Sequence, residues 1–455
     1  MHNTFTKSSN LSILRHVFAS GLVAVLALLL SSCQPTPESE TVIQTGDFLE
    51  ALQETEFTPY EAPEHVKESK TESGLTIAFD AQVLVPEASA YSIVELEQVQ
   101  YSQQEFADLM DLFAPGVNWI NEMESTKSDL IEMNYRIQSS DRYTESEKKE
   151  YERIFQENLE LAPESVTQTP FDLAAAYAAG RGTAWHSLED GSYASFSMNC
   201  NTWSWQYRRK EGASVTRKDF LTPDITESDA FMLADFDREP EINQEEAVAI
   251  AQELLSKLQL SDKLALYSAD KAIVYDCRMP YIYGWYFIFT RVNNGLQVPY
   301  DFSGWNTWQG SPAPAYAAPW DREMVAIFVD ANGVFSCNVC GLAKQTEVLY
   351  ENVALLPFDA LLERIEKQMV YQHAFQQDGV TDQAVKINSI ALRLAVINIK
   401  DKPGYGMLIP SWWVDYVSSY TQNGVENQFN NTTIFNAIDG SYIEPRAMAE
   451  MLGYQ

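Results

Sequence analysis

The chain has 455 residues, with 31 Lys and Arg against 64 Asp and Glu, and it therefore carries a formal net charge of −33 at pH 7. Hydrophobic residues make up 45% of it and aromatic residues 12%, which is enough for sizeable cores and excludes a wholly disordered chain. The acidic balance argues against nucleic acid as a partner and against docking on anionic lipid, because both need clustered basic side chains.

The first 32 residues have the features of a secretory signal. Lys7 and Arg15 precede an uncharged apolar run over 17–30, which is shorter than the roughly 20 residues that a membrane-spanning helix needs. The run leads to Ser31-Ser32-Cys33, which resembles the lipobox of bacterial lipoproteins. The alternative is an ordinary secretory signal with an incidental cysteine, or an uncleaved anchor.

The lipobox resemblance implies that Cys33 carries a diacylglyceryl group and is the first residue of the mature chain. Two or three acyl chains anchor a protein stably where one chain does not. We therefore expect a protein held on the extracytoplasmic face of the cell membrane, with residues 33–60 as lipid anchor and tether. No other cofactor is expected.

A family resemblance rests on two short segments. The start Cys-Gln-Pro-Thr-Pro-Glu at 33–38, followed by a strand that ends in Val-Pro-Glu-Ala at 85–88, resembles a family of Firmicutes surface lipoproteins. That family is known mainly as a domain of unknown function. The resemblance implies no catalytic residue.

Periodicity and capping signals predict an N-terminal α+β domain over residues 61–235. Alternating apolar residues indicate strands, apolar residues at helical spacing indicate helices, and Ser102 with Glu105 forms a capping-box sequence. An acidic, proline-punctuated stretch at 222–241 marks the expected boundary. The expected elements are strands at 75–85, 91–101 and 192–210, a helix after 102, and a helical hairpin over 126–161 broken near 139–143.

Residues 236–455 are expected to form a second α+β region. Asn243 with Glu246 predicts the start of a helix, and Asp-Ala-Asn-Gly at 330–333 predicts a tight hairpin turn. The expected elements are helices at 243–258 and 358–371, strands at 267–277, 281–292, 324–330, 333–340, 387–399 and 406–420, and a last hairpin that turns at 439–440.

A helix followed by strands occurs twice, at 243–292 and 358–420. That order, together with the segments 284–295 and 438–443, resembles PepSY-type modules, which are small extracytoplasmic domains of protease propeptides and of sporulation- or sensor-associated proteins. The resemblance implies a binding or inhibitory role. The expected fold class is therefore α+β, with an N-terminal α+β domain followed by two PepSY-like helix-plus-antiparallel-sheet units.

Four cysteines accompany Cys33, and two of them form a CxxC motif at 337–340. The motif has no second pair at metal-ligand spacing and lies in an alternating, strand-like stretch, which argues against zinc and against thioredoxin-like chemistry. Residues three apart on a regular strand face opposite sides, so these two cannot bond to each other without a local turn. Buried thiols or a structural disulfide are expected, and redox or metal chemistry is the alternative. The candidate residues are Cys200, Cys277, Cys337 and Cys340.

No catalytic constellation or metal site can be assembled from the sequence. The chain has no HExxH motif and no Gly-x-Ser-x-Gly elbow, and His65, His186 and His373 are far apart. A Ser–His–Asp triad stays open because its members need not be near in sequence, and His186 is the best single candidate.

The most unusual segment is 293–321, which is rich in Gly, Pro and aromatic residues. Loops longer than about 12–15 residues are often functional, and Trp and Tyr offer broad contact surfaces with few rotatable bonds. Such rings can stack on sugar rings or clamp a peptide; the alternative is that they pack back on the sheets. The candidate ligand-binding residues are Tyr300, Trp305, Trp308, Tyr316 and Trp320.

Together these features predict a non-catalytic, membrane-anchored lipoprotein that binds or regulates a cell-envelope protein or peptide. The second hypothesis is a lipoprotein that captures a glycan or solute through residues 293–321. The third is a cell-envelope hydrolase. Nucleic acid is not an expected partner.

Lipidation of Cys33 is directly testable. We expect mass spectrometry to find a diacylglyceryl group on Cys33 at the N-terminus of the mature protein, and cell fractionation to recover the protein with the membrane. A bare cysteine at this position, or a protein found in the cytosol, would contradict the localisation and remove the main support for an envelope partner.

Overall fold

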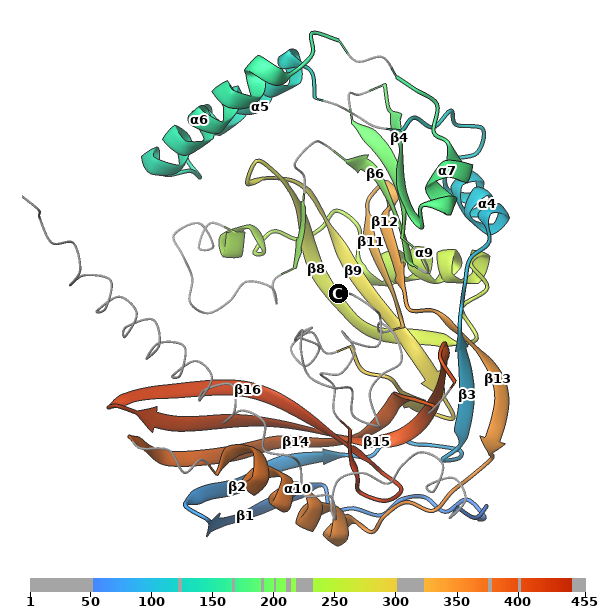
Figure 1. Cartoon of the computed structure of the whole chain (residues 1–455), viewed down its shortest axis with the longest axis vertical. Helices are drawn as coiled ribbons and strands as arrows, with labels where there is room; N and C mark the ends of the chain where they lie inside the picture. The colour runs from blue at the N-terminus through green and yellow to red at the C-terminus, as the bar shows by residue number, and fades with distance from the viewer. Residues whose placement is uncertain are drawn as a thin grey trace, which may run out of the picture.

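The computed structural model describes the chain from residue 52 to residue 443 with gaps. Within these residues, 24% are helical and 47% lie in strands, so the fold is mixed α+β and mostly sheet. The strands form two sheets, one above the other in Figure 1. The described ranges are 52–121, 125–165, 168–189, 192–199, 202–209, 214–217, 232–300, 323–374, 379–399 and 402–443.

One sheet is built from the two ends of the described chain, and we call this part the terminal lobe (52–98 and 343–443). Its strand order is β1-β2-β14-β15-β16-β17, with β3 pairing with β15 and β13 pairing with β3. Its elements are β1 (His65–Glu72), β2 (Leu75–Leu84), β3 (Ile93–Gln98), β13 (Ala343–Tyr350), α10 (Phe358–His373), β14 (Val380–Asn398), β15 (Tyr405–Gln422), β16 (Val425–Asn436) and β17 (Tyr442–Ile443).

The other sheet is formed by the segment between these ends, which we call the inserted lobe (99–342). Its strand order is β4-β5-β6-β12-β11-β9-β8-β7, and β10 pairs with β9. Its elements are α4 (Gln103–Phe113), α5 (Lys127–Ser139), α6 (Glu145–Leu161), α7 (Leu173–Ala178), β4 (Arg181–Ser187), β5 (Tyr193–Asn199), β6 (Thr202–Arg209), β7 (Ser214–Arg217), α9 (Gln244–Lys257), β8 (Leu264–Asp276), β9 (Met279–Asn293), β10 (Leu296–Gln297), β11 (Met324–Asp330) and β12 (Gly333–Cys340).

The predicted division into 61–235 and 236–455 does not separate the two sheets. Strand β2 pairs in parallel with β14, and β6 pairs with β12, so both sheets contain strands from both sides of the predicted boundary. The two predicted helix-then-strands units fall in different lobes, because α9 packs on the inserted sheet and α10 packs on the terminal sheet. Local periodicity indicates where strands occur, but it does not specify which strands pair.

Several local predictions are confirmed. The hairpin of β11 and β12 has the predicted bounds, and α5 and α6 form the predicted helical hairpin. At the start of α4, the Ser102 hydroxyl accepts from the Glu105 amide at 3.2 Å, and the Glu105 carboxylate accepts from the Ser102 amide at 2.7 Å. Asn243 caps α9 with its side chain, which accepts from the Glu246 amide at 2.9 Å. These signals are local, so sequence alone is sufficient to find them.

Each lobe has its own hydrophobic core, to which α10 contributes in the terminal lobe and α9, together with Phe106 and Met110 of α4, in the inserted lobe. In the terminal lobe, Leu361, Ile365 and Met369 of α10 are fully buried against the sheet. In the inserted lobe, α9 buries Ala251 and Leu255 against β9, β11 and β12. Burial of a large apolar side chain contributes about 1.5–3 kcal/mol, so these two faces hold the helices on their sheets.

A buried ion pair lies where the chain passes between the lobes. Arg291, near the end of β9, and Glu323, just before β11, have side chains that are only 5% and 4% exposed. Arg291 Nη2 donates to Glu323 Oε1 at 2.7 Å and to the Ala343 carbonyl at 2.5 Å. The Ala343 amide donates to Glu323 Oε1 at 2.9 Å. The pair therefore joins the inserted lobe to the first residue of β13 in the terminal lobe.

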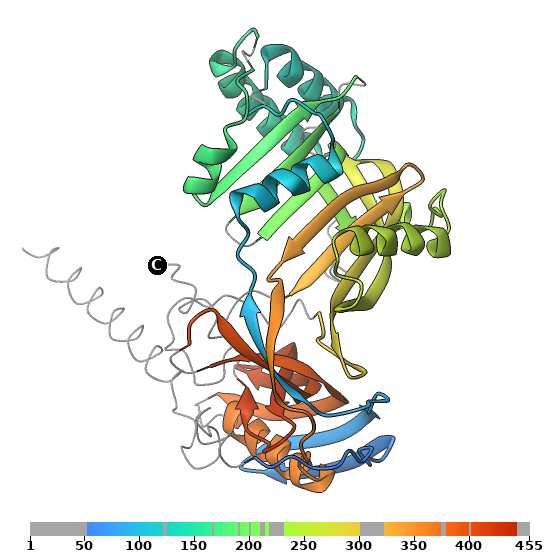
Figure 2. The same cartoon turned by 90° about the vertical axis from the view of Figure 1, so that its right-hand side faces the viewer.

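Strands β3 and β13 run side by side from one lobe to the other (Figures 1 and 2). The Val99 amide donates to the Leu342 carbonyl at 2.7 Å, so the two crossing segments are bonded to each other at the boundary. The chain crosses between the lobes a third time after β9, at Gly295. Gly295 has a φ of +90°, and a Cβ added to it would lie 2.2 Å from the carbonyl oxygen of Glu87. Only glycine fits there.

Removal of one side chain of the Arg291–Glu323 pair is expected to lower the stability of the folded protein. In Glu323→Gln, Arg291 keeps its charge in a buried site without a counter-charge, so we expect the free energy of unfolding to fall by about 3–5 kcal/mol in urea denaturation. In the double variant Arg291→Met, Glu323→Leu the free energy of unfolding should fall clearly less than in the single variant, because no charge is left buried. A loss of less than about 1 kcal/mol in the single variant would show that the pair is not a main determinant of stability.

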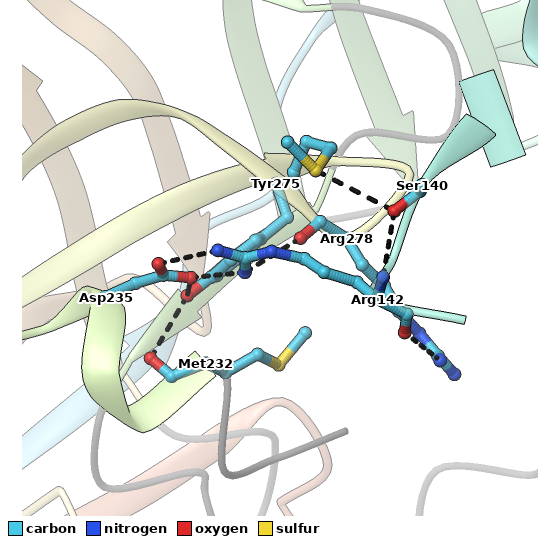
Figure 3. Close-up of polar contacts among 7 residues, drawn as sticks. Ser140, Arg142, Met232, Asp235, Tyr275 and Arg278 are labelled. Atoms are coloured by element: carbon cyan, nitrogen blue, oxygen red, sulfur yellow. Dashed lines mark hydrogen bonds and ion pairs between the residues drawn. The ribbon is translucent and has the colours of Figure 1, made fainter. Parts of the chain in front are cut away.

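The α5–α6 hairpin is attached to the turn between β8 and β9 by a polar cluster (Figure 3). The guanidinium of Arg142 donates to both carboxylate oxygens of Asp235 at 2.5 and 2.8 Å, and the Tyr275 hydroxyl donates to Asp235 at 3.1 Å. Arg142 and Arg278 each donate to the other's carbonyl at 3.1 Å. Bidentate, charge-assisted bonds of this kind fix geometry as well as contributing energy.

The turn itself has an unusual composition. Cys277 and Arg278 have φ values of 49° and 61°, the backbone of a type I′ turn, which usually contains Asn and Gly. Arg278 also donates to Glu147 of α6 at 2.9 Å and lies over the Tyr143 ring at 4.5 Å. These contacts hold a non-glycine residue in the left-handed region, which is otherwise unfavourable.

Acid is expected to loosen this attachment. The hydrogen bond from Arg278, followed by that from the Thr144 amide, lowers the pKa of Glu147 from 4.5 to about 2. A carboxylate with a depressed pKa stabilises the folded state above its unfolded pKa, and this contribution disappears as the pH falls from about 4.5 to about 2. We expect hydrogen exchange of α5 and α6 to accelerate over this range, and Glu147→Gln to remove that part of the pH dependence. Glu160→Gln, at an exposed position of the same helix, is the matched control; an equal effect of both variants would contradict the assignment.

Candidate ligand-binding site between the lobes

A cavity of about 400 Å³ lies between the lobes. This volume falls within the roughly 300–1,000 Å³ typical of small-molecule sites, which also tend to occur at domain interfaces. Its aromatic lining consists of Tyr267, Tyr300, Trp413 and Tyr416, and its uncharged polar lining of Asn388, Asn430, Asn431 and Thr432. The charged lining residues are Arg393 and Asp415.

Two of the lining residues occupy irregular positions in their strands. Tyr267 is the unpaired residue between Leu266 and Ser268, where the register of β8 against β9 shifts. Asn388 occupies the corresponding place in β14, between Ile387 and Ser389. A β-bulge turns one side chain away from the regular alternation of its strand and is common beside binding sites. Bulges on two different sheets therefore supply residues to one cavity.

The terminal sheet forms the other wall through strand register. Asp415 of β15 is directly opposite Thr432 of β16, and the Thr432 hydroxyl donates to its carboxylate at 2.7 Å. Trp413 lies two residues before Asp415 and so points to the same side of the sheet. Its indole Nε1 donates to the Ser411 hydroxyl at 3.0 Å, which fixes the orientation of the ring.

A direct side-chain contact crosses the cavity from lobe to lobe. Arg393 Nη1 of β14 donates to the Tyr267 hydroxyl of β8 at 2.9 Å, and the guanidinium carbon lies 5.9 Å from the Tyr267 ring centroid. On the terminal side, the Tyr416 hydroxyl is 3.0 Å from His373 Nε2. These contacts hold the polar ends of two aromatic side chains, and their rings line the cavity.

The cavity is suited to noncovalent recognition. Aromatic rings pack against apolar faces of a ligand. Asparagine amides both donate and accept hydrogen bonds, the carboxylate accepts, and the guanidinium donates. Ligand hydroxyl groups can therefore find a partner whether they donate or accept. One acidic and one basic side chain leave the lining without a net formal charge.

Only part of the predicted aromatic set can be placed. Tyr300 lines the cavity, and the segment that leads to it is anchored on the terminal lobe, because Leu296 and Val298 belong to that lobe's core. The Asn293 and Asn294 amides donate to Ser92 Oγ at 2.8 and 2.9 Å. Trp305, Trp308, Tyr316 and Trp320 lie outside the described residues, as do Cys33 and Cys200.

Sequence reasoning missed most of the lining residues, including Tyr267, Asn388 and Arg393. One usable signal was present in the adjacent pair Trp412 and Trp413. Neighbouring residues of a strand face opposite sides, so only one of two adjacent tryptophans can face the helix-covered core. Trp412 packs against Phe358 of α10, with ring centroids 5.8 Å apart, and Trp413 faces the cavity.

The predicted CxxC motif lies on a strand, as expected, because β12 ends at Cys340. Cys337 points into the core of the inserted lobe, and its burial raises the pKa of its thiol well above the usual range. Such a thiol stays protonated and is a poor nucleophile or metal ligand. No disulfide joins Cys277, Cys337 and Cys340 among themselves, and a bond that involves Cys200 stays a prediction.

The three predicted histidines lie on separate elements. His65 of β1 contacts Asp80 at 2.9 Å, His373 ends α10, and His186 of β4 meets Trp119 edge-on with ring centroids 6.5 Å apart. The described part of the chain contains no group of three or more His, Cys, Asp or Glu placed to hold a metal ion. None of its helices is both long and apolar enough to cross a membrane.

Comparison with known proteins gives little functional information. No family model and no curated protein matches the sequence. Among solved structures, an uncharacterised protein from Eubacterium rectale ATCC 33656 is similar at 12% identity and a TM-score of 0.42, over 84% of this chain and 93% of that chain. Function is therefore inferred from the chemistry of this chain's own residues.

Proposed function

We propose that the protein is a non-catalytic, membrane-anchored extracytoplasmic lipoprotein that captures a glycan in the cavity between its lobes. The observation that carries this proposal is the lining of that cavity, where four aromatic rings meet asparagine amides, a carboxylate and a guanidinium. Of the hypotheses made from the sequence, glycan capture is the one that this lining favours.

A sugar matches such a lining because it has two kinds of surface. The C–H faces of the ring are apolar and pack on Trp and Tyr rings. The hydroxyl rim needs donors and acceptors at short spacing, which Asn430, Asn431 and Asp415 offer. Tyr267 from the inserted lobe and Tyr300 from the segment after β10 line the same cavity as Trp413 and would contact the same ligand.

The proposed location rests on the lipobox-like Ser31-Ser32-Cys33 and the apolar run before it. An acylated Cys33 would hold the terminal lobe near the membrane through residues 34–51. The sequence resemblance to PepSY-type modules implies a binding role, and α9 and α10 each pack on the sheet of their own lobe. Within this proposal the two units are binding modules rather than catalytic domains.

Glycan binding can be tested by calorimetric titration of the detergent-solubilised full chain. The panel should contain monosaccharides, cell-wall oligosaccharides and cell-wall peptides. We expect heat from saccharides, and Tyr300→Ala should weaken binding by about tenfold, equivalent to about 1.4 kcal/mol, because it removes one stacking surface. Tyr207→Ala, at a 37% exposed position on β6, is the matched control.

The same titration separates the two main hypotheses from the sequence. Binding of peptides but not saccharides would overturn glycan capture and favour an envelope protein or peptide as the partner. Binding of neither class, with thermal unfolding unchanged in the variants, would count against the cavity as a site. Thermal unfolding of each variant is needed because Tyr300 also belongs to the segment anchored on the terminal lobe.

A further inference from the structure

Arg393 supplies the positive charge of the cavity lining, and the side chain that it contacts is neutral. Its Nη1 donates to the Tyr267 hydroxyl at 2.9 Å, and its guanidinium carbon lies 5.9 Å from the centroid of the same ring. Over the described ranges of the chain, no Asp or Glu oxygen lies within 4.0 Å of this guanidinium. The charge is therefore partly buried in a cavity without a carboxylate beside it.

Other partly buried arginines of this chain are paired. In the inserted lobe, each described arginine whose side chain is 30% exposed or less has a carboxylate oxygen within 4.0 Å. These arginines are Arg136, Arg142, Arg208, Arg217, Arg278 and Arg291. The chain has 64 acidic side chains from which such partners can come. Arg393 departs from this pattern.

The acidic residue of the same lining, Asp415, does not neutralise Arg393. Arg393 is directly opposite Ser411, which lies four residues before Asp415 on β15. At about 3.3 Å per residue, this separation corresponds to about 13 Å along the strand. The Asp415 carboxylate accepts instead from the Thr432 hydroxyl at 2.7 Å. The cavity therefore has a basic end at Arg393 and an acidic end at Asp415.

One sugar residue can contact both the guanidinium and an aromatic ring of the lining. Trp413 is directly opposite Ala391, and Arg393 lies two residues beyond Ala391, so Trp413 and Arg393 project from the same side of the sheet. Diagonal neighbours of this kind are about 7–8 Å apart. A sugar ring that packs on Trp413 therefore places a substituent of that ring within reach of Arg393.

The remaining N–H groups of Arg393 are suited to an oxyanion. A guanidinium has five N–H donors in a planar fork, and one of them is bonded to Tyr267. Carboxylate and phosphate groups accept two parallel bonds from such a fork, and these charge-assisted bonds are about twice as strong as neutral ones. The net charge of −33 does not prevent this contact, because charges farther away than about 8 Å are largely screened at physiological ionic strength.

We infer that the captured glycan contains an acidic sugar, and that the carboxylate or phosphate group of this sugar pairs with Arg393 while its ring packs on Trp413. This inference rests on the proposed function. Arg393 is then a specificity-determining residue. A neutral sugar meets the aromatic and amide groups of the lining but leaves the guanidinium without a counter-charge.

A comparison of acidic sugars with their neutral parents tests the inference. The probes are galactose, galacturonate and galactose 6-phosphate, with glucose, glucuronate and glucose 6-phosphate as a second series, titrated calorimetrically into the detergent-solubilised full chain. We expect the wild-type protein to bind an acidic member of at least one series about tenfold more tightly than the neutral parent. In Arg393→Gln the acidic and neutral members should bind alike.

Matched variants separate the loss of charge from damage to the contact between the lobes. Tyr267→Phe removes the hydroxyl that Arg393 contacts but keeps the guanidinium, so it should retain the preference for the acidic sugar. Arg181→Gln makes the same chemical change at an exposed position of β4, outside the cavity, and should leave all affinities unchanged. Thermal unfolding of each variant shows whether it is folded.

The outcomes distinguish this inference from the function on which it rests. Equal binding of acidic and neutral sugars by the wild-type protein, or a preference that persists in Arg393→Gln, would overturn the inference while glycan capture stands. A wild-type protein that binds neither these sugars nor the cell-wall oligosaccharides would overturn both.

Discussion

The Arg291–Glu323 ion pair joins the two lobes at the place where the chain passes between them. Removing two charges from water is expensive, so a buried pair is retained only where its geometry satisfies both groups. Here the pair also bonds to the amide and the carbonyl of Ala343, which begins β13. One charged cluster thus fixes the end of β9, the start of β11 and the start of β13 relative to one another.

The position of the cavity follows from that junction. Beyond Arg291 the chain continues through Gly295 to Tyr300 along the terminal lobe, and Arg393 contacts Tyr267 from the other side. The Arg291–Glu323 junction is buried and held by several hydrogen bonds, whereas the Arg393–Tyr267 contact is a single hydrogen bond between partly exposed side chains. A ligand that competes for Arg393 or Tyr267 would therefore act at the weaker of these two contacts between the lobes.

Local structure was predictable because its signals are local. The Ser102 capping box, the Asn243 cap and the turn before Gly333 each involve residues within a few positions of one another, and all three are confirmed. Strand partners were not predictable in the same way. The parallel pairing of β2 with β14 joins strands from opposite ends of the chain, and no short-range pattern encodes it.

The candidate site was harder to predict than the fold for a specific reason. Tyr267 and Asn388 reach the cavity because the alternation of their strands breaks at these residues, so a reading based on regular alternation assigns them the wrong face. Tyr300 was found because it is the first aromatic residue of the unusual segment 293–321. Arg393 and Asp415 could not be singled out from the sequence. Among 31 basic and 64 acidic side chains, nothing in the sequence indicates which ones line a cavity.

The pairing of β3 with β13 has an evolutionary consequence. Gln98 and Ala343 are directly opposite each other, although the whole inserted lobe lies between them in the sequence. The chain therefore leaves and re-enters the terminal sheet at adjacent residues. A segment with such neighbouring ends can be gained, lost or replaced as a cassette without separating the strands on either side. A shortened chain with one tight connection in place of 99–342 would keep these strand pairs and would lose only Leu296 and Val298 from the buried core of the terminal lobe.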